Sequence, residues 1–174
     1  QGSQVAQDDV ASIFSLGTGK GNEFFTINCG YEGTGGVMLT RHRLLEEKIL
    51  SDSVMNIPIK SVGAVAQTDI DGDGDLDLFL GGGVYPGKYP ESSTSAIYLR
   101  DGTQYVPDPS NAKALLGLGV VNGAVWCDLD VDGYPELITA GHWQPVRIFK
   151  NEKGILKNVT KEMGLEGFTG LWNS

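Results

Sequence analysis

Two acidic loops dominate the chemistry that this sequence can support. The first runs from 69 to 77 as DIDGDGDLD, and the second runs from 128 to 136 as DLDVDGYPE. Both follow the pattern D-x-D-x-D-G-x-x-[D/E] and together hold nine of the 22 acidic residues. Repulsion among so many carboxylates disfavours a folded loop unless a cation neutralises them. The alternative is a pair of solvated acidic turns without metal, since Asp and Gly are also ordinary turn formers.

Calcium is the cation that this spacing fits best. Ca²⁺ takes about six to eight oxygen ligands in flexible geometry. Side chains at positions 1, 3 and 5 can converge, glycine at position 6 permits a sharp turn, and the acid at position 9 completes the site. We therefore predict two structural Ca²⁺ sites. The first comprises the side chains of Asp69, Asp71, Asp73 and Asp77 with the carbonyl of Asp75, and the second comprises Asp128, Asp130, Asp132 and Glu136 with the carbonyl of Tyr134.

An EF-hand does not fit these loops. That motif needs a bidentate Glu at position 12, where this chain has Leu80 and Thr139. Each loop also runs directly into a short apolar stretch that ends in glycine, which indicates a strand and not an exiting helix.

The loops divide the chain into three modules, over 1–60, 61–119 and 120–174. A degenerate copy of the loop occupies 15–23 in the first module, where only Glu23 keeps an acid, so we expect no calcium there. Each module offers about four short strands, which predicts an all-β fold of β-propeller-type blades.

The downstream half of each module predicts a β-hairpin. Residues 97–106 and 146–156 both read as strand, turn and strand, and residues 36–40 with a partner in 43–50 take this role in the first module. Short helical turns are expected at 112–116 and 160–163. The segment 85–93 is rich in Pro, Gly and Ser and predicts an exposed loop, where function often resides.

The loop followed by a short apolar strand resembles the FG-GAP/VCBS repeat of integrin α-subunit propellers and of many bacterial secreted proteins. Three stretches are more similar to the repeat region of the ASPIC/UnbV, cartilage-acidic-protein-like group. They are 75–82 with the following 86–90, 140–146 and the terminal 171–174. This resemblance implies a calcium-stabilised propeller outside the cytoplasm, engaged in recognition and without catalysis. Three blades are fewer than the four to eight of typical propellers, so we expect part of a larger or assembled propeller, with self-association through open blade edges.

Composition excludes several classes of protein. An apolar content of 40% is typical of a globular chain. The net charge is −9, and two Ca²⁺ ions would bring it to −5. The sequence shows no basic patch for nucleic acid and no stretch of 18 apolar residues that could span a membrane. No signal peptide is evident, although the chain could begin after a removed one.

Few other residues suggest a site. His42 and His142 lack partners at metal-ligand spacing, and we expect both to be structural. Cys29 and Cys127 are expected to be buried free thiols, with a disulfide as the open alternative. The sequence contains no nucleophile or metalloprotease motif, so we expect no enzyme.

Aromatic residues are the better ligand candidates. Trp126, Trp143 and Trp172 could stack on sugars, but packing between blades is the simpler expectation for a tryptophan in a strand such as Trp126. Tyr85, Tyr89 and Trp143 flank predicted loops and are the preferred ligand residues.

Three functions stay open at this point. The first is a module that recognises an unidentified protein or glycan through its loops. The second is a purely structural repeat of a larger secreted protein. The third is the propeller part of a polysaccharide-active enzyme, which would need an acid/base pair outside the calcium loops. We expect an extracellular, cell-surface or periplasmic location, where calcium is available to weak sites.

Overall fold

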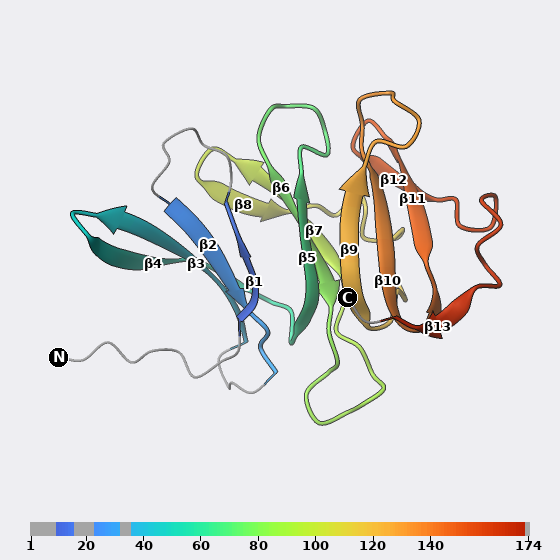
Figure 1. The fold of residues 1–174 in the computed structure, drawn as a ribbon, viewed down its shortest axis with the longest axis horizontal. Helices are drawn as coiled ribbons and strands as arrows, with labels where there is room; N and C mark the ends of the chain where they lie inside the picture. Colours follow the sequence, from blue (N-terminus) through green and yellow to red (C-terminus); the bar gives the residue numbers. More distant parts are fainter. Residues whose placement is uncertain (1–9, 16–22, 32–35, 173–174) are drawn as a thin grey trace.

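Three antiparallel β-sheets make up the described part of the chain. The computed structural model describes residues 10–15, 23–31 and 36–172. Its sheets lie side by side along the molecule, in the order of the sequence (Figure 1). The fold is all-β, as the sequence predicted, and its repeated sheets are those of propeller-type blades.

The first sheet pairs its four strands in chain order. They are β1 (Val10–Phe14), β2 (Glu23–Asn28), β3 (Val37–Leu45) and β4 (Lys48–Ile57). The β3–β4 hairpin turns at Glu46 and Glu47, both with positive φ. Residues 37–40 therefore pair with residues 53–57 of β4. The prediction that their partner lies within 43–50 is wrong. Residues 16–22 of the degenerate loop lie outside the described part of the chain.

The second and third sheets repeat one plan. The second contains β5 (Val62–Thr68), β6 (Asp77–Gly82), β7 (Ala96–Asp101) and β8 (Gln104–Pro107). The third contains β9 (Val121–Cys127), β10 (Glu136–Pro145), β11 (Arg147–Glu152) and β12 (Ile155–Asn158), and β13 (Thr169–Leu171) adds to the far end of β10. The hairpins β7–β8 and β11–β12 confirm the two that the sequence predicted. The fifth strand, β13, was not predicted.

The middle sheet is covered on both faces. Leu78 and Leu80 of β6 face the first sheet, whereas Phe79 between them faces the third. Alternate residues of a strand point to opposite faces, so one strand contributes to two cores. All six residues of β6 are buried. Such a continuous apolar run is typical of a strand packed between two layers.

The first strands of the sheets approach one another closely. β5 contacts both β1 and β9. A Cβ added at Gly63 would lie 2.2 Å from the carbonyl oxygen of Val121, so only glycine permits this approach of β5 to β9. The blades therefore pack closely along these strands.

The links between strands are turns. Leu115 N donates to Asn111 O over 3.2 Å, and Met163 N donates to Val159 O over 3.0 Å, which places a single helical turn at each predicted position. In the described ranges no helix is long and apolar enough to cross a membrane.

The two cysteines are free, but they are not both buried. Cys29 is half-buried, and Cys127 is exposed. Along β9, Trp126 packs against the core between the second and third sheets, so its neighbours Val125 and Cys127 turn outward. The prediction of two buried thiols is therefore wrong for Cys127.

Candidate metal centres

The two acidic loops occupy equivalent places in successive sheets. One joins β5 to β6 and the other joins β9 to β10. Both lie along the same edge of the molecule, at the top of Figure 1, whereas the loop between β6 and β7 extends from the opposite edge. The predicted sites are thus neighbours in space.

In the first loop, Asp69 organises the turn. Its carboxylate accepts hydrogen bonds from Gly72 N (2.7 Å), Asp73 N (3.1 Å) and Gly74 N (2.9 Å). Gly72 and Gly74 both have positive φ, which favours glycine at these positions. The loop therefore closes around its first acid.

Three carboxylates of this loop converge. Asp69, Asp71 and Asp77 each offer an oxygen, and these oxygens lie within 4.8 Å of one another. Asp71 is exposed, whereas Asp77 is only 3% exposed. An all-oxygen donor set of this kind suits a hard cation.

Asp77 also connects the loop to two strands. One carboxylate oxygen accepts from Ile70 N (3.0 Å), and the other accepts from Arg100 N of β7 (2.8 Å). Burial raises the pKa of Asp77 to about 6, and the charges of Asp71 and Asp73 act in the same direction. A bound cation would relieve both effects by compensating the buried charge.

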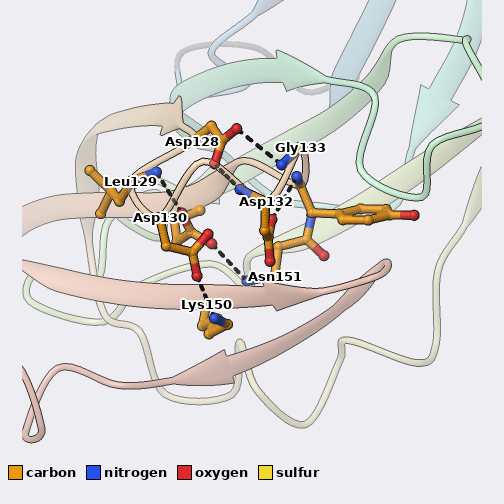
Figure 2. Close-up of polar contacts among 9 residues, drawn as sticks. Asp128, Leu129, Asp130, Asp132, Gly133, Lys150 and Asn151 are labelled. Atoms are coloured by element: carbon orange, nitrogen blue, oxygen red, sulfur yellow. Dashed lines mark hydrogen bonds and ion pairs between the residues drawn. The ribbon is translucent and has the colours of Figure 1, made fainter.

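The second loop repeats this arrangement. Asp128 accepts from Asp132 N (3.2 Å) and Gly133 N (3.1 Å), as Figure 2 shows. Glu136 is 3% exposed and accepts from Leu129 N (2.8 Å) and from Asn151 N of β11 (3.4 Å). The position-9 acid therefore has the same role in both loops: it ties the loop to the third strand of its sheet.

The same three positions converge in the second loop. Asp128, Asp130 and Glu136 offer oxygens that lie within 4.8 Å of one another. Asp73 and Asp132, at position 5, are not members of the two clusters; they accept from the backbone N–H two residues on, at 2.8 and 2.9 Å. Their coordination, and that of the Asp75 and Tyr134 carbonyls, stays a prediction.

A lysine distinguishes the second centre from the first. Lys150 of β11 forms an ion pair with Asp130 (Figure 2), which lowers the pKa of Asp130 and raises that of Lys150. By strand register the equivalent residue in the second sheet is Leu99. The second centre thus contains a lysine ammonium group beside one of the predicted ligands. In the first centre the nearest counterpart is Arg100, whose guanidinium lies 3.9 Å from Asp75.

The donor sets of both loops fit calcium. Each loop brings three carboxylates together and buries one of them. Backbone N–H groups donate hydrogen bonds to that buried acid, so the fold itself holds it in place. The residues that would hold the ions are those of the two clusters, with Lys150 as a competing charge in the second.

A buried hydrogen-bond chain links the two loops. Asn151, fully buried, donates from Nδ2 to Ile70 O of the first loop over 2.9 Å. Its own backbone N–H donates to Glu136 of the second loop. Ile70 N in turn donates to Asp77, so Asn151 and Ile70 together connect the two position-9 acids.

Close packing reinforces this link. A Cβ added at Gly72 would lie 3.3 Å from the ring of Tyr134, and one at Gly154 would lie 3.2 Å from Cβ of Asp71. The first loop therefore packs directly against the third sheet. Asn151 and Arg100 were missed as functional residues. Both lie in polar stretches at the ends of their strands, beside Lys150 and Asp101, so their residue types carried no signal.

The histidines are structural in the described contacts. His42 has both ring nitrogens engaged, with Thr26 and Ser51 hydroxyls at 2.8 Å each, and its ring stacks on Phe24. His142 makes an edge contact with the ring of Tyr89, whose centroid lies 6.2 Å away.

The predicted aromatic residues fall into two groups. Trp126 packs against the core between the second and third sheets, as expected. Tyr89 and Trp143 are brought together at the surface, whereas Tyr85 lies under the ammonium group of Lys88 within its own loop.

A known family model matches part of the chain. Residues 69–139 match the family described as an FG-GAP-like repeat. The matched segment begins at the first residue of the first loop, contains the whole second loop and ends in β10. No curated protein matches the chain. The FG-GAP resemblance is thereby confirmed for this segment, and the narrower resemblance to the ASPIC/UnbV group stays a prediction.

Proposed function

Because residues 69–139 form an FG-GAP-like repeat, we propose that this chain is a calcium-binding repeat module of a larger secreted or cell-surface protein, acting in protein or glycan recognition. One observation carries the calcium assignment: two clusters of three carboxylates recur at equivalent positions of successive sheets. Each cluster includes a buried acid that is hydrogen-bonded to the third strand of its sheet.

Calcium in this proposal is structural. Bound ions would supply positive charge to carboxylates that the fold already brings together. Asp69 and Asp128 hold their loops closed, while Asp77 and Glu136 fasten the loops to β7 and β11. An ion shared by these acids would stabilise the loop and the adjoining strands together.

The proposed location follows from the metal. Extracellular modules bind Ca²⁺ with dissociation constants of roughly 10⁻⁴–10⁻³ M, which suits a secreted, surface or periplasmic protein. A purely structural repeat is the second candidate, supported by the closely packed blades and the exposed apolar residues of the third sheet, such as Val125 and Leu171. The absence of catalytic activity is likewise part of the proposal.

A calcium titration tests the metal assignment. Chelator-stripped protein is titrated with Ca²⁺ in a calorimeter, and two ions per chain are expected. Asp71→Ala should reduce the stoichiometry to one by removing a ligand of the first centre, and Asp130→Ala should do the same for the second. Asp101→Ala, which removes an acid at the β7–β8 turn outside both clusters, is the matched control. No binding by the folded wild type, or two ions bound by Asp71→Ala, would contradict the assignment.

A further inference from the structure

Two exposed aromatic side chains from different sheets meet on the edge opposite the acidic loops. Trp143 Nε1 donates a hydrogen bond to the hydroxyl of Tyr89 over 3.1 Å, across 54 residues of sequence. Tyr89 belongs to the loop between β6 and β7, which extends from the lower edge in Figure 1, and Trp143 lies near the end of β10. Their side chains are nevertheless 58% and 67% exposed, so the pair is held in place without being buried.

The loop that carries Tyr89 is internally ordered. Tyr85 N donates to Glu91 O (2.7 Å), and Glu91 N donates to Lys88 O (2.8 Å). Lys88 lies over the Tyr85 ring and 3.7 Å from the Glu91 carboxylate. At the base of the loop, buried Ser93 accepts from Ser61 N. Tyr89 is therefore presented by a closed loop whose own charges are paired.

Trp143 is held in an unusual conformation. Its φ is +57°, a strained value for a bulky residue, and it sits where the pairing of β10 with β13 shifts register. Bulges of this kind re-aim a side chain. The neighbours fix the position, because His142 N and Gln144 Nε2 both donate to Val120 O, at 3.1 and 2.7 Å. Strain of this kind is typical of sites that hold a side chain for a ligand.

The chemistry of the pair selects its ligand. The tyrosine oxygen satisfies the indole N–H, whereas the tyrosine O–H is left to donate to a ligand, and more than half of each side chain is exposed as contact surface. His142 lies against Tyr89, and Lys88 and Glu91 stand in the same loop as Tyr89. A matching ligand needs one apolar face with polarised C–H groups and a hydroxyl-bearing rim, as a pyranose ring has.

We propose that Tyr89 and Trp143 form a binding platform for a pyranose unit of a glycan. A protein partner is less well matched, since a stable protein interface buries about 800 Å² on each side and two rings offer only about 150–250 Å² apiece. This inference rests on the proposed recognition function and names the ligand class, but it is independent of the calcium loops, which lie along the other edge (Figure 1).

The test is glycan binding by the whole chain in the presence of Ca²⁺. The protein is applied to an array of neutral and acidic oligosaccharides, and the affinity for any oligosaccharide that binds is measured by calorimetry. Trp143→Ala and Tyr89→Ala should each weaken binding at least tenfold. Tyr89→Phe, which keeps the ring but loses the hydroxyl, should weaken it only several-fold. Tyr31→Ala, at a tyrosine 50% exposed in the first module, is the matched control and should bind as wild type does.

The calcium titration separates failure of this inference from failure of the proposed function. Two bound ions with no glycan signal would overturn the platform and leave the calcium assignment intact. Retained glycan binding by both alanine variants would also overturn it, as would a protein ligand that competes for the same two residues. Should Trp143→Ala lose its fold, seen as lost calcium stoichiometry, Tyr89→Ala decides the question, because Tyr89 lies in an exposed surface loop.

Discussion

The position-9 acids are the residues on which each loop depends. Asp77 and Glu136 are buried, and each accepts hydrogen bonds both from its own loop and from the next strand along the chain. The sequence predicted these acids as ligands. It did not show their second role, because the partners Arg100 and Asn151 lie 23 and 15 residues further along the chain.

Asp77 predicts an unusual pH dependence for the metal-free protein. The pKa of Asp77 is about 6 in the folded protein, against 3.8 for an unperturbed aspartate. Between these two pH values the folded state therefore binds more protons than the unfolded state does. Stability should therefore fall as pH rises from about 4 to about 6, by up to roughly 1.4 kcal/mol per pH unit. Urea unfolding in chelator measures this slope, and Asp77→Asn should lack it. Saturating Ca²⁺, which favours the ionised carboxylate, should remove the fall; an equal slope in wild type and Asp77→Asn would contradict the prediction.

Lys150 predicts that the two centres differ in affinity. The lysine competes with a metal for the charge of the Asp130 carboxylate. Lys150→Leu copies the residue at the equivalent position, Leu99, and should tighten calcium binding at the second centre by roughly twofold to fivefold, the range expected for an exposed ion pair. Calorimetry in an Asp71→Ala background isolates this centre. Leu99→Met, which alters the equivalent position of the other sheet without changing charge, serves as control, and weaker binding after Lys150→Leu would show that the lysine supports the site.

At the scale of the elements, local sequence patterns predicted individual turns and strands reliably, but they did not predict the contacts between sheets. The acid and glycine spacing predicted both turns, and the apolar runs predicted β6, β10 and the two hairpins, because these depend on neighbours in sequence. The meeting of Tyr89 with Trp143 depends on how two sheets pack, and no local pattern encodes it. The same reason explains the exposed Cys127 and the added strand β13.

Asn151 predicts that the two loops bind calcium cooperatively. It bridges Ile70 of the first loop and Glu136 of the second, so ordering one loop should favour the other. Titration should show tighter binding in the wild type than in either single-site variant, Asp71→Ala or Asp130→Ala. Asn151→Ala should abolish that difference and lower stability by about 1–3 kcal/mol, since it leaves a buried carbonyl unsatisfied.

A matched control is available in the same sheet. Asn158 is exposed at the end of β12 and accepts from Thr160 N. Asn158→Ala should leave both affinities unchanged. Equal affinity of each centre in wild type and single-site variants would show that the hydrogen-bond chain carries no coupling.

At the scale of the whole molecule, the described sheets form a row and not a closed ring (Figure 1). The middle sheet is covered on both faces, whereas the third leaves Val125, Val131 and Leu171 exposed. The predicted self-association through open blade edges stays a prediction. Fold class was predictable here because repetition of one plan is visible in sequence; the boundaries of the three modules stay predictions.

The double coverage of the middle sheet has a consequence for the order in which the chain folds during synthesis. Phe79 is buried by side chains that include Leu137 and Phe149, which leave the ribosome more than fifty residues later. The carbonyl of Ile70 likewise waits for Asn151. The second module therefore emerges with one face uncovered and the Ile70 carbonyl unpaired, and both are completed only when β11 arrives. A chain interrupted between β9 and β11 would expose Phe79 and its neighbours, which makes that interval the one in which a chaperone has most to protect.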